Sequence, residues 1–218
     1  MLLAATVPDE GRSMDVADFG SGSGAVGMAI ASRIVGANVT LVEIDETSME
    51  QARRGLALPA NARFADRVTV KRADLAVGTA TFGGTLDHVL ANPPFDPSPH
   101  GRRSPDQRKA LAHVMEPDTL LNWTRAAVEA LRPGGRATFI LRPESLPELL
   151  ATWAGRLSGP AVLPVHTGAG QATRILVRGR KARREKLRLL LPFLMRDANG
   201  PTPEGDAVMN GESTLRLD

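Results

Sequence analysis

A group of glycines directly after a short hydrophobic run constrains the fold of this chain most strongly. Residues 16–19 (Val-Ala-Asp-Phe) have the composition of a buried strand, and three glycines follow within five positions: Gly20, Gly22 and Gly24. Residues 25–35 then carry apolar side chains at four-residue steps, which is the spacing of one helix face. A strand, a glycine turn and a helix in this order predict the opening of a βαβ unit.

Strand-like and helix-like stretches alternate along the rest of the chain as well. We expect helices over residues 47–58, 119–131 and 145–157. The further predicted strands cover residues 39–42, 68–70, 86–90, 137–141, 161–165 and 173–177. The last two strands are close in sequence, which favours an antiparallel hairpin. The predicted class is therefore α/β, with a mostly parallel sheet that ends in this hairpin.

Local signals predict where two of these helices begin and where one ends. Asp118 or Thr119 stands in the cap position before one apolar stripe. Ser145 and Glu148 have the spacing of a capping box. The run 133–135 (Pro-Gly-Gly) is predicted to end the helix that starts near residue 119.

The composition excludes several kinds of chemistry. The 218 residues include no cysteine, which rules out disulfides, thiolate metal sites and cysteine nucleophiles. The His, Asp and Glu residues lack metal-ligand spacing, so no metal is predicted. No apolar run approaches the roughly 18 residues of a membrane span, and residues 8–10 (Pro-Asp-Glu) interrupt the place of a signal peptide. We therefore expect a cytoplasmic protein without membrane contact.

Charge is distributed unevenly between the two halves of the chain. Residues 1–100 hold 8 Lys/Arg against 12 Asp/Glu, a net −4, whereas residues 101–200 hold 18 against 8, a net +10. The basic excess predicts contact with an anionic polymer, with a solvated basic face as the alternative. The candidate contacts to nucleic acid are Arg102, Arg103, Arg180, Lys181, Arg183 and Arg184.

The glycine turn is a candidate site for a nucleoside-containing cofactor. Glycines let the backbone approach a ligand closely, and the following helix offers free N–H donors. Glu43 ends the second predicted strand, where a carboxylate can accept both ribose hydroxyls. The spacing Gly22-x-Gly24-x-x-Gly27 also fits a nicotinamide or flavin dinucleotide, and a purely structural turn is a third alternative. Asp18 favours a cationic cofactor such as S-adenosylmethionine (SAM), because its carboxylate would repel a pyrophosphate.

The sequence Asn92-Pro93-Pro94-Phe95 follows the fourth predicted strand. Two prolines cannot continue a central strand, so the chain must leave the sheet at the carboxyl edge, where ligands bind in α/β folds. The Asn92 side-chain oxygen and the Pro93 carbonyl can accept both protons of a planar amine, which exposes the nitrogen lone pair to a methyl donor. Phe95 can stack on a planar substrate. A rigid turn with Phe95 in the core is the alternative.

Together, the glycine loop, Glu43 and the Asn-Pro-Pro-Phe turn resemble the class I SAM-dependent amino-methyltransferases. The resemblance covers residues 16 to 178 and implies a Rossmann-like sheet of seven strands with helices on both faces. It also implies that Asp18 lies near the methionyl end of SAM, that Glu43 takes the ribose hydroxyls, and that Asp74 holds the adenine amine. The implied cofactor-binding residues are Asp18, Gly20, Ser21, Gly22, Gly24, Glu43, Ile44, Asp74, Leu75 and Asn92.

Motifs farther along the chain narrow this resemblance. Residues 104–106, 131–135, 187–190 and 201–204 are similar to the bacterial tRNA (adenine-N6)-methyltransferase family, whose members act on a valine tRNA. Membership implies methyl transfer to adenine N6 near the anticodon of a tRNA. The implied catalytic residues are Asn92, Pro93, Pro94 and Phe95. Two features differ: relatives carry a further segment before Leu2, and the best-known members have Tyr where Phe95 stands.

The resemblance also predicts the domain organisation. Residues 1–186 are expected to form the methyltransferase domain, and residues 187–218 a C-terminal extension packed on the same domain. Within the class, a protein-glutamine or rRNA-guanine amino-methyltransferase is the alternative. The alternative from another class is a non-catalytic module that binds RNA or SAM. The oligomeric state is open between monomer and homodimer.

Overall fold

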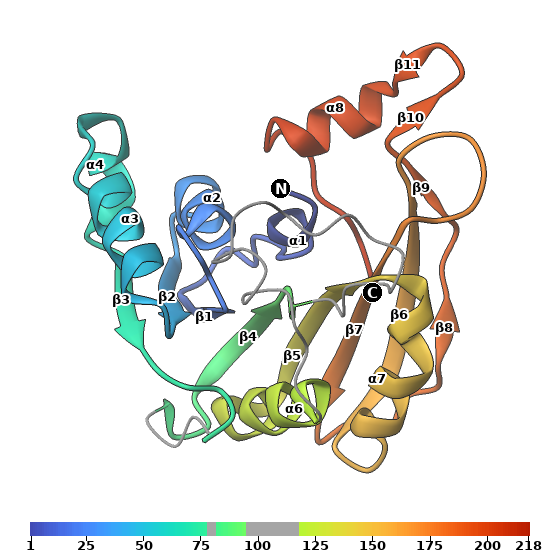
Figure 1. Cartoon of the computed structure of the whole chain (residues 1–218), viewed down its shortest axis with the longest axis horizontal. Helices are drawn as coiled ribbons and strands as arrows, with labels where there is room; N and C mark the ends of the chain where they lie inside the picture. Colours follow the sequence, from blue (N-terminus) through green and yellow to red (C-terminus); the bar gives the residue numbers. More distant parts are fainter. Residues whose placement is uncertain (78–81, 95–117) are drawn as a thin grey trace.

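A single mixed sheet forms the centre of the molecule in the computed structural model, which describes residues 1–77, 82–94 and 118–218 (Figure 1). Its strands follow the order β3-β2-β1-β4-β5-β7-β6-β8, and β9 also pairs with β6. They are β1 (Met14–Phe19), β2 (Ala37–Glu43), β3 (Val68–Arg72), β4 (Leu86–Ala91), β5 (Leu131–Leu141), β6 (Leu157–His166), β7 (Arg174–Lys181), β8 (Arg188–Leu189) and β9 (Phe193–Leu194). The strands β1 to β5 are all parallel to one another, whereas β7 is antiparallel to both β5 and β6. The predicted mostly parallel sheet with an antiparallel hairpin is confirmed, and β8 and β9 extend its edge.

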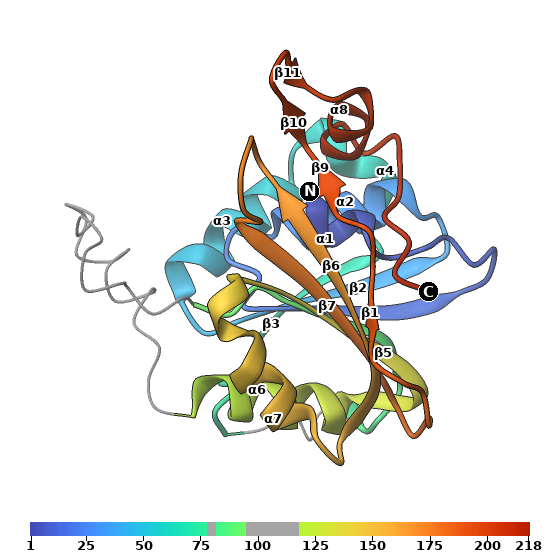
Figure 2. The same cartoon turned by 90° about the vertical axis from the view of Figure 1, so that its right-hand side faces the viewer.

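Helices cover both faces of this sheet (Figures 1 and 2). They are α1 (Leu2–Ala5), α2 (Ala25–Arg33), α3 (Glu46–Leu56), α4 (Ala62–Ala65), α6 (Thr119–Ala130), α7 (Leu146–Trp153) and α8 (Pro203–Met209). Short 3-10 turns cover Pro59–Asn61 and Pro143–Ser145, and β10 (Arg196–Asp197) pairs with β11 (Gly200–Pro201) in a small separate hairpin. The helices α6 and α7 lie on the opposite face from α1 and α2, as the resemblance to class I methyltransferases implies.

Successive side chains of a strand point to opposite faces of the sheet, so the core consists of two clusters, one on each face. In β1, Val16 belongs to the cluster that packs against α1 and α2, whereas Ala17 and Phe19 belong to the cluster that packs against α6 and α7. In the second cluster the rings of Phe139 and Trp153 meet edge to face, with centroids 5.6 Å apart. Strands that are apolar on both faces require cover on both faces, which explains the three layers.

The two predicted side-chain caps are wrong. Asp118 precedes α6 in a left-handed conformation (φ 69°), and its side chain makes no cap hydrogen bond. Ser145 makes none either, because a 3-10 turn already leads into α7 at this residue. The Pro-Gly-Gly run lies inside β5, and α6 ends before it at Ala130. The Lys181 ammonium of β7 satisfies carbonyls at this helix end, donating to Val128 and Leu131 at 2.6 Å each.

The segment 187–218 packs on the sheet and on α1. Leu215 and Leu217 are buried in the same cluster as Leu3, and the Leu215 N–H donates to the Ala5 carbonyl at 2.8 Å. These contacts fit the expectation that residues 187–218 pack on the rest of the chain. The division of the chain at residue 186 stays a prediction. Among the described helices, none is long and apolar enough to cross a membrane.

Candidate cofactor and substrate site

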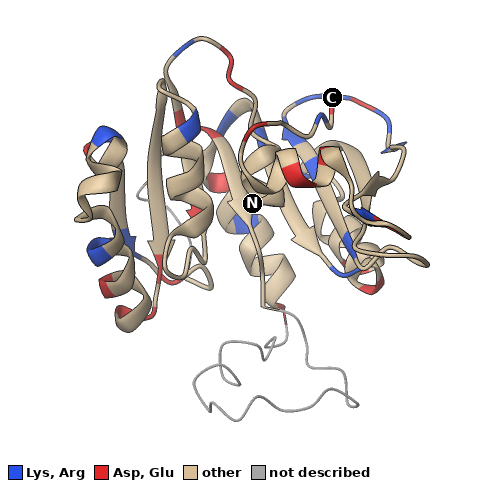
Figure 3. Cartoon of the chain, turned by 90° about the horizontal axis from the view of Figure 1, so that it is seen from above, with Lys and Arg blue, Asp and Glu red and all other residues tan. Residues whose placement is uncertain are grey.

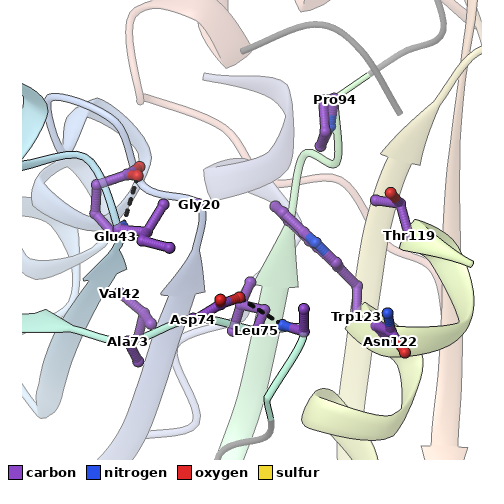
Figure 4. A pocket seen from close by; sticks show the side chains of 12 residues that line it. Gly20, Val42, Glu43, Ala73, Asp74, Leu75, Pro94, Thr119, Asn122 and Trp123 are labelled. Atoms are coloured by element: carbon purple, nitrogen blue, oxygen red, sulfur yellow. Dashed lines mark hydrogen bonds between the residues drawn. The ribbon is translucent and has the colours of Figure 1, made fainter. Parts of the chain in front are cut away.

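A pocket opens at the carboxyl edge of the parallel strands, where β1, β2, β3 and β4 end side by side (Figure 4). It is lined by Gly20, Val42, Glu43, Ile44, Ala73, Asp74, Leu75, Ala76, Pro94, Thr119, Asn122 and Trp123. Ligands in open α/β sheets bind at this edge, because the loops after the strands diverge there. The pocket therefore lies where the sequence predicts a cofactor.

The glycine turn needs its glycines for backbone conformation. Gly20, Gly22 and Gly24 have φ values of 65°, 54° and 85°, a region in which side chains with a Cβ are strained. The Gly20 N–H donates to the Val42 carbonyl at 2.9 Å, which joins the turn to the end of β2. Gly20 lines the pocket, whereas Ser21, Gly22 and Gly24 support the turn outside its lining.

Gly27 serves packing rather than ligand binding. It lies inside α2, and a Cβ at this position would stand 2.2 Å from a methyl carbon of Leu41 in β2. Helix and sheet therefore approach closely only with glycine here. Because this packing serves any cofactor bound at the turn, the Gly22-x-Gly24-x-x-Gly27 spacing does not by itself favour a dinucleotide.

Glu43 organises the loop at the end of β2. One carboxylate oxygen accepts a hydrogen bond from the Gly22 N–H at 2.8 Å, and the other accepts from Ile44 at 2.7 Å and Asp45 at 3.0 Å. A carboxylate has about four lone-pair sites, so capacity is left for a ligand hydroxyl. The position fits the predicted contact with a ribose, and it also shows a structural role that the sequence did not reveal.

Asp18 lies beneath the glycine turn rather than in the pocket lining. It is 3 % exposed, and its carboxylate accepts a hydrogen bond from the Gly27 N–H at 3.0 Å. Burial, together with the charge of Glu43, raises the pKa of Asp18 to about 7 against the opposing effect of this hydrogen bond. A cation placed above this buried carboxyl would stabilise its ionised form.

Asp74 begins the turn that follows β3. Its carboxylate accepts the Ala76 N–H at 2.8 Å, and both Asp74 and Leu75 line the pocket opposite Gly20. The charged residues among the lining are Glu43 and Asp74, and both are acidic. The described wall thus suits a cationic or neutral ligand and offers a pyrophosphate no arginine or lysine.

The Asn-Pro-Pro turn reaches the same pocket from the end of β4. Pro94 is part of the lining, Pro93 is buried, and the Asn92 side chain is exposed. The predicted stacking residue Phe95 lies outside the described residues, as do the predicted RNA contacts Arg102 and Arg103. Of the predicted cofactor contacts, the pocket brings together Gly20, Glu43, Ile44, Asp74 and Leu75, whereas Asn92 does not line it.

Sequence reasoning missed one wall of the pocket. Thr119, Asn122 and Trp123 come from the first two turns of α6, and Figure 4 shows the Trp123 side chain directed from the helix towards the Pro94 turn. In the sequence, Trp123 shares the apolar stripe of this helix with Leu120 and Ala127 and so resembles a core residue. The available signal was its place in the chain, because a helix that follows the β4 loop begins at the same sheet edge.

The basic stretch between Arg174 and Arg188 is not one exposed patch. Arg178 is 3 % exposed and donates to Thr138 and to the Thr6 carbonyl, and burial lowers its pKa to about 10. Arg180 pairs with Asp218 at 3.0 Å.

Lys181 donates hydrogen bonds to the carbonyls at the end of α6. The predicted RNA contacts Arg180 and Lys181 therefore both have partners within the fold. Arg183 and Arg184 are exposed, as predicted. Figure 3 shows basic and acidic segments interspersed over the described chain. In the described residues no group of His, Asp and Glu is arranged to hold a metal ion.

Fold and pocket together define a class I methyltransferase. A sequence profile for the methyltransferase small domain matches residues 1–150, and the chain belongs to this family. A solved structure described as a predicted O-methyltransferase from Agrobacterium tumefaciens is 32 % identical, with a TM-score of 0.83 over 99 % of this chain and 97 % of that one. SAM is the cofactor of this class. The predicted fold and methyltransferase family are confirmed.

Two kinds of curated relatives are similar to the chain. A tRNA1(Val) (adenine(37)-N6)-methyltransferase of Glaesserella parasuis is 25 % identical over 68 % of this chain and 60 % of its own length. One from Porphyromonas gingivalis is 30 % identical over 61 % of this chain and 51 % of its own length. A release factor glutamine methyltransferase of Rhodopirellula baltica is 31 % identical over 60 % of this chain and 45 % of its own length. The chain thus spans about half the length of the curated relatives it matches.

Proposed function

We propose that this protein transfers a methyl group from SAM to an exocyclic amine, with adenine N6 in a tRNA, near the anticodon, as the substrate. The observation that carries the proposal is one pocket that joins Glu43 and Asp74 to Pro94 of the Asn-Pro-Pro turn. Acidic groups suited to an adenosine and a turn suited to an amine thus share one space. The tRNA-directed relatives support the choice of substrate.

The residues of the pocket fit SAM. In this assignment Glu43 accepts the ribose hydroxyls, Asp74 accepts the adenine amine, and Ile44 and Leu75 pack on the adenine faces. Asp18 offers negative charge from beneath the turn to the cationic end. Bound SAM supplies an electrophilic methyl carbon. A nicotinamide dinucleotide fits less well, because the described lining adds acidic charge and the buried Asp18 adds more.

The Asn-Pro-Pro turn would then hold the amine. The Asn92 side-chain oxygen and the Pro93 carbonyl accept its two protons, which directs the nitrogen lone pair at the methyl carbon. Bound SAM would supply the methyl carbon and its sulfur would leave with the bonding electron pair, while Asn92 and Pro93 would keep the amine nitrogen positioned to accept the methyl group. The alkylated amine loses one proton to solvent, so no strong base is required.

RNA contact is proposed through Arg183 and Arg184, whose side chains are exposed. Phosphate contacts of this kind supply affinity without sequence selectivity. A release factor glutamine is the second candidate substrate, because its side-chain amide also presents a planar NH₂ and relatives of that type are similar over 60 % of this chain.

One experiment tests the assignment. The protein is incubated with labelled SAM and with either undermodified tRNA or a release factor, and the modified residue is identified by mass spectrometry. We expect N6-methyladenosine in tRNA. Asn92→Ala should lower this rate about a hundredfold or more, since the amine loses its orientation. SAM binding by this variant should persist, because Asn92 does not line the pocket. Label on glutamine, or none in either substrate with SAM bound, would refute the tRNA assignment.

A further inference from the structure

We propose that Trp123 is a cofactor-positioning residue whose indole ring packs against the sulfonium end of bound SAM. The proposal rests on the proposed function, since it needs SAM in this pocket. It assigns a role to a side chain that the described part of the structure places between the glycine turn and the Asn-Pro-Pro turn.

The location follows from where the two ends of the cofactor must lie. Glu43 and Asp74 mark the adenosine end, at the carboxyl ends of β2 and β3. The methyl group has to face the Asn-Pro-Pro turn after β4, because the amine is held there. The sulfonium would therefore lie in the part of the pocket near Gly20 and Pro94, and the Trp123 side chain borders this part in Figure 4.

The indole of Trp123 turns one edge to Gly20 and packs in part against the core cluster on the α6 face of the sheet. A Cβ built on Gly20 would lie 2.5 Å from Cη2 of Trp123 and 3.3 and 3.4 Å from Cζ3 and Cζ2. These three atoms form the outer edge of the six-membered ring, so the ring meets Gly20 with its edge. Trp123 also lines the pocket, and a cation placed over a ring face that borders the pocket would be attracted by the ring quadrupole.

The electrostatic surroundings favour a cation at this point. The charged residues in the described lining are both acidic, and Asp18 lies buried beneath the turn. An aromatic side chain adds attraction for a cation that an aliphatic side chain such as leucine would not provide. The helix is held in place independently, because Lys181 from β7 binds the carbonyls at its other end.

Comparison of a cation with its neutral counterpart isolates this contribution. SAM carries a sulfonium, whereas S-adenosylhomocysteine has an uncharged thioether and otherwise the same groups. We expect Trp123→Leu to weaken SAM binding about fivefold to thirtyfold more than binding of the homocysteine compound, which is the range of desolvated cation–π contacts. Trp123→Phe should show a smaller change in the same direction, because it keeps a weaker aromatic face.

The measurement is isothermal titration calorimetry of both ligands on all variants, with circular dichroism to verify folding. Trp153→Phe is the matched control, because this tryptophan is buried in the core and its loss should change stability without changing the SAM preference. Equal losses for both ligands in Trp123→Leu and Trp123→Phe would overturn the proposal. Failure of the wild type to bind either ligand would instead refute the proposed function.

Fluorescence gives a second test that needs no change at Trp123. The chain has two tryptophans, so the Trp153→Phe variant reports on Trp123 alone. Saturation with SAM should shift or quench its emission, and the homocysteine compound should do so less. Unchanged emission at SAM concentrations that calorimetry shows to be saturating would contradict contact with the ring, even if Trp123→Leu failed to fold.

Discussion

The Glu43 carboxylate accepts a hydrogen bond from the Gly22 N–H at 2.8 Å and so ties the end of β2 to the glycine turn after β1. Two loops from neighbouring strands thus share one anionic group, which also accepts N–H donors of Ile44 and Asp45. Since the same carboxylate is assigned to the cofactor ribose, loop order and cofactor affinity should change together.

We expect Glu43→Ala to weaken binding of S-adenosylhomocysteine about tenfold or more, because charge-assisted hydrogen bonds contribute about 1.5–3 kcal/mol. Glu43→Gln should lose less, since it keeps one oxygen acceptor. Calorimetry provides the affinities, and hydrogen exchange at the Gly22 amide reports loop order. Glu46→Ala in α3 is a matched control, because Glu46 forms an exposed ion pair with Arg53 away from the pocket. Unchanged affinity in Glu43→Ala would refute its role in binding.

Ligand binding should depend on pH through Asp18. The raised pKa means that Asp18 is largely protonated below about 7 in the free protein. A cationic ligand stabilises the ionised form and lowers this pKa, so SAM affinity should rise with pH from 5.5 to 7, by up to about tenfold per unit. Neutral 5′-methylthioadenosine should show no such dependence, and Asp18→Asn should flatten the SAM profile. Calorimetry across this range tests it, and a flat profile in the wild type would contradict it.

Folding stability should contain two opposing pH dependences. Burial lowers the pKa of His88 to about 3, aided by the charges of Arg136 and Arg178, whereas the pKa of Asp18 is raised to about 7. Between about pH 4 and 6.5 the unfolded chain protonates His88 and ionises Asp18, and the folded chain does the reverse. Acidification therefore destabilises the fold through His88 and stabilises it through Asp18.

Variants should separate these two terms. In Asp18→Asn the free energy of unfolding should fall by up to about 1.4 kcal/mol per unit of acidification in this range, because the His88 term is no longer offset. His88→Leu should show the opposite slope. Urea denaturation at several pH values measures both, and slopes of the same sign in the two variants would refute the assignment.

Measurements of tRNA affinity should distinguish the exposed Arg183 and Arg184 from Lys181, whose ammonium binds carbonyls within the fold. Replacing both Arg183 and Arg184 by Gln should weaken tRNA binding and make the slope of log affinity against log salt shallower by about 1.5, since two phosphate contacts are lost. SAM affinity should stay unchanged. Lys181→Gln is the comparison, because it removes the donor at the end of α6 and should lower the melting temperature instead. If the salt dependence of tRNA binding were unaltered in the double variant, Arg183 and Arg184 would not be contacts to the tRNA phosphates.

Much of the fold could be predicted because its signals are local. The glycine turn and the Asn-Pro-Pro turn each follow a hydrophobic run, and in a parallel sheet such turns must meet at one edge. Glu43 was predicted for the pocket from its place at the end of the second strand, and Asp74 from the resemblance to class I methyltransferases.

The errors concern contacts made between distant segments. The spacing of Ser145 suits a capping box. In the structure, however, Ser145 is the last residue of a 3-10 turn, and its side chain makes no cap hydrogen bond. Trp123 fits an apolar helix stripe whether its indole faces the core or a pocket, so periodicity cannot tell the two apart. Arg178 and Lys181 belong to a basic run in sequence, yet each donates hydrogen bonds to carbonyls of distant segments, Arg178 to Thr6 and Lys181 to Val128.

The bond from the Leu215 N–H to the Ala5 carbonyl also bears on how the protein is made. During synthesis α1 is made before the leucines that complete its cluster, which follow more than two hundred residues later. Until Leu215 and Leu217 leave the ribosome, apolar groups of α1 and the adjacent sheet lack part of their cover. The nascent chain therefore exposes this surface while the intervening residues are made, and folding of this layer is completed only after Leu215 and Leu217 have been added.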